Sequence, residues 1–258
     1  MPFDKSGLIS KVEFCVKLKE MHNLPFIIPI LFVLTTLITV WQFYNAANRS
    51  RAVIVSLSLL LLLQAAVALS GFYQVTESFP PRFVLLIGPG LLFSVFLFLT
   101  KWGRIFIDSL NIEKLTLLHT LRIPVEITLY FVWTAKLIPG LMTFEGDNYD
   151  IISGLTAPVI FYLVFVSKKL NHKSLLIWNL VCLGLLVNVL VIAILSAQTP
   201  FQKLAFDQPN IGVTIFPFVW LPSVIVPIVF LSHLAAIRQL ILAGKKTAPA
   251  TKLIATRN

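Results

Sequence analysis

The sequence predicts an all-α polytopic membrane protein: a bundle of about seven transmembrane helices with a short N-terminal amphipathic helix. The chain has 258 residues, of which 57% are hydrophobic and only 12% are charged, whereas ordinary soluble domains carry about 25% charged residues. The apolar residues form runs of roughly twenty, the length that crosses about 30 Å of hydrocarbon. Only helices and closed barrels satisfy their backbone groups in lipid, and runs of this length fit helices.

Three parts are expected along the chain. Residues 1–23 form an interfacial amphipathic segment, residues 24–242 the seven-helix transmembrane domain, and residues 243–258 a basic cytoplasmic tail. In the first part Leu8, Val12, Cys15 and Leu18 share one helical face, which favours a helix lying on the bilayer. A solvated arm is the alternative. No apolar run precedes a small-residue cleavage site there, so no cleavable signal peptide is expected.

The predicted spans follow from the positions of the apolar runs. They cover residues 24–44, 52–73, 83–100, 115–136, 151–166, 174–198 and 211–234. The Gly88-Pro89-Gly90 sequence predicts a kink or a break in the third span. Residues 102–114 should run along the surface or extend the fourth span. A count of six is the alternative, with the third or fifth run re-entrant.

The distribution of basic residues predicts an orientation. One side of the seven-span topology carries thirteen: Arg49, Arg51, Lys101, Arg104, Lys114, Lys168, Lys169, Lys173, Arg238, Lys245, Lys246, Lys252 and Arg257. The other side has three in its loops and four in the N-terminal segment. The positive-inside rule therefore places the C-terminus in the cytoplasm and the N-terminus outside, in a bacterial-type inner or plasma membrane.

The fourth span carries a polar stripe. His119, Arg122 and Glu126 are spaced by three and four residues, which places them on one side of a helix. A charge at the centre of a membrane helix costs on the order of 3 kcal/mol, so the stripe should face the bundle interior and contact polar groups of other helices. Together with polar residues of other spans it predicts a substrate or proton site: His119, Arg122, Glu126, Tyr130, Asn179, Asn188 and His233.

Two interpretations of Arg122 and Glu126 remain open at this point. A directly paired, dry Arg122–Glu126 would be a structural contact between or within helices. A pair split around a pocket would be a site, because ionisable residues inside membranes usually mark a pathway or a binding site.

A second candidate site lies in the TFEGDNYD loop at residues 143–150. It contains the acidic cluster Glu145, Asp147 and Asp150 and no basic residue, and the predicted topology faces it outward. These carboxylates could bind a cation with Asn148, although their spacing does not match an EF-hand. The alternative is a turn whose Asp150 lies near the N-terminus of the fifth span, where a negative charge suits the helix dipole.

Neither a metal nor a cofactor is expected. His119 and His233 could in principle pair on zinc or haem, but no second ligand shows a suitable spacing. Hydrolase, metalloprotease, phosphate-loop and dinucleotide motifs do not occur. The net charge of +10 is attributed to cytoplasmic loops facing lipid head groups, and no nucleic-acid partner is expected.

The leading functional hypothesis is binding or translocation of a small solute or proton through a polar cavity lined by the fourth span. One alternative is a membrane-embedded enzyme acting on a lipid or isoprenoid, with Glu126 or His119 as general base and Arg122 holding an anionic head group. Another is a membrane sensor or interaction protein. The expected partners are the lipid bilayer and a small-molecule or lipid ligand, and the oligomeric state is left open.

Overall fold

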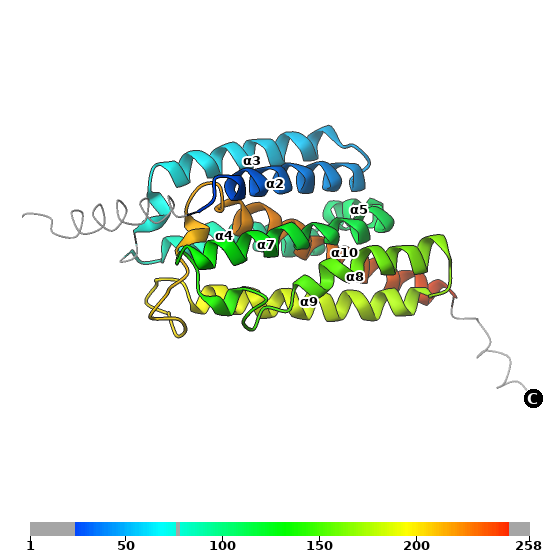
Figure 1. Cartoon of the computed structure of the whole chain (residues 1–258). Coiled ribbons are helices and arrows are strands. Elements are labelled where there is room, and N and C mark those ends of the chain that lie inside the picture. Colours follow the sequence, from blue (N-terminus) through cyan, green and yellow to red (C-terminus); the bar gives the residue numbers. More distant parts are fainter. Residues whose placement is uncertain (1–23, 76–77, 248–258) are drawn as a thin grey trace, which may run out of the picture.

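The computed structural model describes residues 24–75 and 78–247 (Figure 1). The predicted amphipathic helix within residues 1–23 and the last part of the predicted tail lie outside these ranges. The described residues form helices and no named strand. The α-helices are α2 (Ile27–Ala46), α3 (Arg51–Leu69), α4 (Arg82–Leu99), α5 (Lys101–Ser109), α6 (Ile112–Leu118), α7 (Arg122–Thr134), α8 (Ile151–Phe161), α9 (His172–Leu195) and α10 (Val226–Thr247).

Six helices of the described ranges are long and apolar enough to cross a membrane. They are α2, α3, α4, the continuous Ile112–Thr134 segment, α9, and Leu221–Lys245. The fifth predicted span is a shorter apolar helix, Ile151–Val166, in which α8 continues into a π-helical turn, Tyr162–Val166. The all-helical prediction is therefore confirmed, whereas the described residues contain six helices long and apolar enough to cross a membrane and do not confirm the count of seven.

The helices run side by side in three groups (Figure 1). The hairpin of α2 and α3 lies on one side, α8 and α9 lie on the other, and α4, α7 and α10 lie between them. Among the six long spans, the one containing α10 is the most buried and α3 the least. The core therefore surrounds α10, and α3 presents most of its apolar surface outward, as a lipid-facing helix would.

The third span is not interrupted at Gly88-Pro89-Gly90. α4 remains one helix from Arg82 to Leu99 with Pro89 inside it. The small residue beside the proline serves packing instead: a Cβ on Gly90 would lie 2.4 Å from Cγ of Pro227 on α10. Gly90 thus allows α4 and α10 to cross at close range.

The fourth span changes its helical geometry next to the polar stripe. A 3₁₀ turn, His119–Leu121, joins α6 to α7. Pro124 has no N–H to donate to the carbonyl of Thr120, four residues earlier, so the regular α-helical ladder cannot continue through this point. The tighter turn places His119 and Arg122 at the junction, in the middle of the span.

The seventh span begins at Leu221, ten residues later than predicted. Residues 211–220 are apolar, but they contain a short 3₁₀ turn, Gly212–Thr214, and irregular backbone. Most of this segment is buried in the bundle, where protein groups satisfy it; Ile211 and Gly212, for example, donate their N–H groups to the carbonyl of Leu137 at 3.0 and 2.6 Å. Irregular backbone at membrane depth requires this kind of burial.

α8 is a half-length element. It begins about midway along α9 (Figure 1), and the chain from the end of α7 returns into the bundle to reach it. Asp150, directly before α8, contacts Arg122. Arg122 is the eleventh residue of Ile112–Thr134, which places it about 15 Å from one end and about 18 Å from the other. The N-terminus of α8 therefore lies near the middle of the bundle.

Candidate functional site

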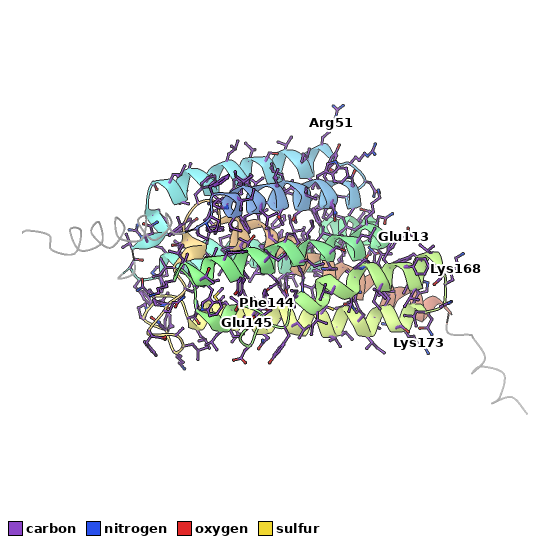
Figure 2. All side chains as sticks on the ribbon, in the orientation of Figure 1. Arg51, Glu113, Phe144, Glu145, Lys168 and Lys173 are labelled. Atoms are coloured by element: carbon purple, nitrogen blue, oxygen red, sulfur yellow. The ribbon has the colours of Figure 1, made fainter. Side chains whose placement is uncertain are left out.

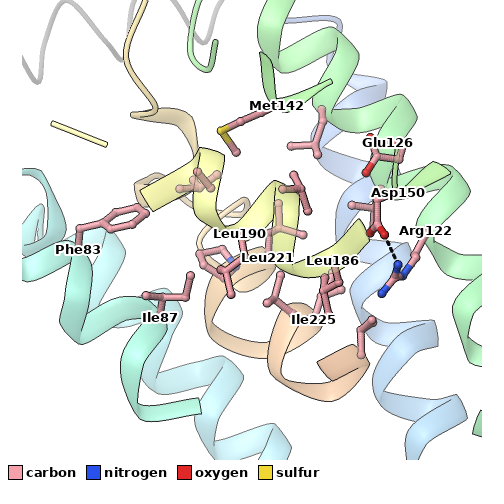
Figure 3. A pocket seen from close by; sticks show the side chains of 18 residues that line it. Phe83, Ile87, Arg122, Glu126, Met142, Asp150, Leu186, Leu190, Leu221 and Ile225 are labelled. Carbon is pink, nitrogen blue, oxygen red and sulfur yellow. Dashed lines mark hydrogen bonds and ion pairs between the residues drawn. The ribbon is translucent and has the colours of Figure 1, made fainter. Parts of the chain in front are cut away.

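A cluster of ionisable side chains lies at the centre of the bundle. Arg122 and Glu126 on α7 are 4% and 2% exposed, so the prediction that both are buried is confirmed. Asp150 is buried beside them at the N-terminus of α8. Figure 3 shows all three near one another on the same side of a cavity.

Arg122 does not pair with Glu126. Its Nη1 forms an ion pair with Oδ1 of Asp150, drawn as a dashed line in Figure 3. Its Nη2 lies 3.2 Å from Nε2 of His233 on α10. Ser153 adds a longer hydrogen bond, its Oγ donating to Oδ1 of Asp150 at 3.4 Å. One guanidinium therefore joins α7, α8 and α10, with its charge balanced across helices.

His233 extends this network to α9. Its Nδ1 lies 2.9 Å from Oδ1 of Asn179, and Nδ2 of Asn179 donates to the carbonyl of Leu175 at 2.9 Å. Because the Arg122 guanidinium can only donate, Nε2 of His233 accepts and Nδ1 carries the proton. The contacts thus select the neutral Nδ1–H tautomer, with Asn179 oriented by its own second bond.

Glu126 has a different partner. Nδ2 of Asn148 donates to both carboxylate oxygens, at 2.9 and 2.8 Å, and also to the carbonyl of Met142 at 2.9 Å. Oδ1 of Asn148 accepts from the backbone N–H of Asp150 at 3.0 Å. In the described residues no lysine, arginine or histidine forms an ion pair with Glu126. The carboxyl group therefore has a neutral partner, whereas Arg122 already has its counter-charge.

His119 packs against His233 and does not line the cavity. The two imidazole rings stack with centroids 3.9 Å apart and planes 11° from parallel, and Trp178 packs edge-on against His119 at 5.6 Å. Nδ1 of His119 is buried with no hydrogen-bond partner in the structure. Stacked rings do not aim their nitrogens at one shared point, and the described residues contain no group of three potential metal ligands. This arrangement does not fit a metal or haem between the two histidines.

The cavity beside the cluster has a volume of about 60 Å³. Three of its lining residues are charged, and they are Arg122, Glu126 and Asp150. The other fifteen are apolar residues of α4, α7, α9, α10 and the adjoining segments. At roughly 10–15 Å³ for each water, the space suits a few waters or a small ligand. The three charged residues, here called the ionic wall, line one side of the cavity, and its other lining residues are apolar.

Two predicted site residues lie away from this cavity. Tyr130 is half-buried and stacks on Phe144 with ring centroids 5.3 Å apart. Asn188 is exposed, and its Nδ2 donates to the carbonyl of Asp147 at 2.8 Å. Hydrogen bonds therefore connect four of the predicted site residues, directly or through Asn148 and Asp150: Arg122, Glu126, Asn179 and His233. His119 stacks on His233 but does not line the cavity, and Tyr130 and Asn188 lie outside this network.

The acidic loop does not form one cluster. Glu145 and Asp147 are exposed, whereas Asp150 turns inward to Arg122. The side chain of Asp150 makes no cap hydrogen bond to α8, so its main partner is the guanidinium and not the helix terminus. The sequence also gives no sign of the contact between Asn148 and Glu126. The two lie 22 residues apart across an irregular loop, and no periodic pattern connects them.

Taken together, the fold and the cavity define a class: in its described residues the protein is all-helical, with six helices fit to cross a membrane and three charged residues beside a cavity at its centre. The chain belongs to the family described as a domain of unknown function, DUF8737, whose model matches residues 83–241. That range includes α4 to most of α10 and therefore every residue of the ionic wall. No curated protein and no solved structure matches the chain.

Proposed function

We propose that this chain is an integral membrane protein that binds a small solute or a proton in the cavity walled by Arg122, Glu126 and Asp150. The observation that carries the proposal is the split of the two charges on α7. Arg122 is neutralised by Asp150, and Glu126 faces the cavity with the Asn148 amide as its hydrogen-bond partner among the described residues. A purely structural Arg122–Glu126 contact would have joined the two directly.

The position of the wall supports a role in exchange across the membrane. It lies near mid-span, where α8 begins, and residues of Leu221–Ile225, the π-helical turn at the start of the last span, line the same cavity. Interrupted helices near the midplane are a recurring way to expose polar backbone and side chains to a solute in transporters. In this proposal Glu126 is the group that takes up the proton or the cationic part of a solute. The Arg122–Asp150 pair holds the neighbouring helices.

The proposed orientation places the C-terminal end of α10 in the cytoplasm. Arg51, Lys168 and Lys173 lie at one end of the bundle and point away from it (Figure 2), and α10 ends at the same side (Figure 1). The positive-inside rule supports assigning that end to the cytoplasm. Membrane insertion itself is tested by alkaline carbonate extraction of membranes containing the full chain: release into the supernatant would contradict it.

The lipid-enzyme alternative is less well supported by the geometry. His119, one of its two candidate bases, is fully enclosed by His233 and Trp178 and does not reach the cavity. Glu126 would have to act alone as the base. We therefore favour binding or exchange over catalysis.

A proton-flux assay tests the proposal with the proton itself as the probe. The full chain is reconstituted into liposomes containing a trapped pH-sensitive dye, and internal acidification is followed after an external acid pulse. We expect faster acidification than in protein-free liposomes, and Glu126→Gln should abolish the excess. Glu113→Gln is the matched control, because Glu113 is an exposed carboxylate on the same span and lies outside the cavity.

Two results would count against the proposal. Wild-type liposomes that acidify no faster than protein-free liposomes would remove the proton from consideration as the exchanged species. Equal flux in Glu126→Gln and Glu113→Gln, with both proteins monodisperse and equally reconstituted, would remove Glu126 from the pathway.

A further inference from the structure

A second and larger cavity, of about 260 Å³, lies between α3 and α4. Residues of α10 and of the turn before it form its floor, and α5 closes one end. It shares no lining residue with the cavity beside Arg122. It is therefore a separate site, here called the α3–α4 groove.

The groove lies where α3 and α4 make few direct contacts with each other. α3 contacts α2 and the Leu221–Ile225 turn more extensively than it contacts α4. On the opposite side α4 is held close to α10 at Gly90, where a Cβ would collide with Pro227. α3 is thus held by α2 and α4 by α10, and both contact the Leu221–Ile225 segment, so the open space lies between α3 and α4 where the two make few direct contacts.

The lining of the groove suits hydrocarbon. Most of its lining residues are apolar, and no ionisable side chain is among them. The hydroxyls of Ser94 and Ser223 are already satisfied within their helices: they donate to the carbonyls of Gly90 and Val219 at 2.9 and 2.7 Å. An apolar chain in the groove would therefore leave neither of these hydroxyls without a hydrogen bond.

α5 is an amphipathic helix fixed across the end of the groove. Trp102 and Phe106 line the groove and stack with ring centroids 6.2 Å apart, while Ile105 is 71% exposed. Exposed tryptophan and isoleucine on a short amphipathic helix are typical of the membrane–water interface. A Cβ on Gly103 would lie 2.2 Å from the carbonyl oxygen of Leu97, so only glycine allows α5 to fold back this closely on the end of α4.

Contacts with α10 hold α5 in this position. Arg238 donates from Nε and Nη2 to the two carboxylate oxygens of Asp108, at 2.8 and 2.9 Å. Gln239 donates to the carbonyls of Ile107 and Leu110 at 2.8 and 2.9 Å. The end of the groove therefore has a fixed structure, because hydrogen bonds connect α5 to α10, which belongs to the most buried span of the bundle.

The charge at this end is positive. Arg51 at the start of α3 and Lys101 at the start of α5 both lie at this end of the groove without lining it, and Arg51 points away from the bundle (Figure 2), where a head group would lie. Arg104 lies on α5 as well, and the carboxylate of α5, Asp108, is already paired with Arg238. An anionic head group is the partner that complements free basic side chains at an interface.

We propose that the α3–α4 groove binds a membrane phospholipid with an anionic head group. One of its two acyl chains lies between α3 and α4 over Pro227, and its head group is held near Arg51 and Lys101 beside Trp102. The inference rests on the proposed membrane location. It does not depend on solute or proton binding beside Arg122.

Native mass spectrometry of the full chain in detergent tests the groove, with phosphatidylglycerol and phosphatidylcholine of identical acyl chains as the probes. Ser56→Trp places a large side chain in the groove, whereas Ser58→Trp makes the same change on α3 at a position that does not line it. We expect Ser56→Trp to weaken phosphatidylglycerol binding about tenfold and Ser58→Trp to leave it unchanged. Equal binding by the two variants, at equal melting temperatures, would overturn the groove as the site.

A second pair of variants tests the head group. Arg51→Gln with Lys101→Gln should reduce the preference for phosphatidylglycerol over phosphatidylcholine by about tenfold. Lys168→Gln with Lys173→Gln removes two charges from the same end of the bundle, away from the groove (Figure 2), and should preserve the preference. A wild-type chain that binds both lipids equally would overturn the anionic specificity. A chain that stays soluble without detergent would instead contradict the membrane location.

Discussion

Replacing Asp150 with asparagine should destabilise the bundle through a specific electrostatic cost. Asparagine keeps the size of the side chain but removes the charge that balances Arg122. The side chains of the pair are only 5% and 7% exposed, and removing one partner of a buried ion pair typically costs about 3–5 kcal/mol because the other charge stays buried. His233 still accepts a hydrogen bond from Arg122, so we expect the lower end, about 3 kcal/mol.

The ion pair between Asp108 and Arg238 provides a matched control. It joins the same residue types, but its side chains are 39% and 27% exposed. Exposed pairs contribute about 0–1 kcal/mol, so Asp108→Asn should have a small effect. In a chain of this size about 3 kcal/mol corresponds to a melting temperature lower by about 6–12 °C.

Thermal unfolding in one detergent, followed by circular dichroism, measures both variants. Arg122→Gln and the double variant Arg122→Gln/Asp150→Asn complete a double-mutant cycle. The loss of unfolding free energy in the double variant should be smaller, by about 2 kcal/mol or more, than the sum of the losses in the two single variants. If Asp150→Asn melts within 2–3 °C of Asp108→Asn (roughly 1 kcal/mol), the claim that Asp150 neutralises a buried Arg122 is wrong. Strict additivity in the cycle would refute the direct pairing.

Three further outcomes are expected. Gly90→Ala should lower the free energy of unfolding by about 1–3 kcal/mol, because the new Cβ would lie 2.4 Å from the ring of Pro227 on α10. Gly184→Ala is the control: a Cβ there has no atom within 4 Å, so the variant should unfold near the wild-type temperature in the same assay. Asn148→Leu removes the amide that binds Glu126 and should cost about 1–3 kcal/mol, clearly more than Asn188→Leu at an exposed site; equal melting temperatures would contradict this. A reporter that is active only in the cytoplasm should be active when fused after the last residue. Activity of a reporter that works only outside the cytoplasm, fused at the same place, would reverse the proposed orientation.

Much of the fold could be predicted because long uninterrupted apolar runs strongly constrain the backbone. A run of about twenty apolar residues has few alternatives to a spanning helix. The predicted positions of α2, α3, α4 and α9 agree with the structure within a few residues. The predicted start of the seventh span was wrong. Residues 211–220 are as apolar as a membrane-spanning helix, but most of them are buried as irregular backbone. Apolar composition indicates that a segment is buried, but it does not show whether the buried backbone is helical.

The burial of Arg122 and Glu126 was also determined by the sequence. Two charges with helical spacing in an apolar run must face the protein, since the cost of exposing them to hydrocarbon is too large. Which groups they contact was decided only by the tertiary structure. Asp150 and Asn148 reach them because α8 starts at mid-bundle, and His233 reaches Arg122 from α10, 111 residues away.

The sequence by itself thus determined that the chain is an apolar helical bundle with ionisable groups inside it. Periodicity and transfer free energy act locally, residue by residue, so they can be read along one segment. The pairing of Arg122 with Asp150, the isolation of Glu126 beside a cavity and the groove between α3 and α4 depend on how distant segments approach one another. Only the packing of the helices decides those distances, because the same polar stripe could have met several different partners at similar local cost.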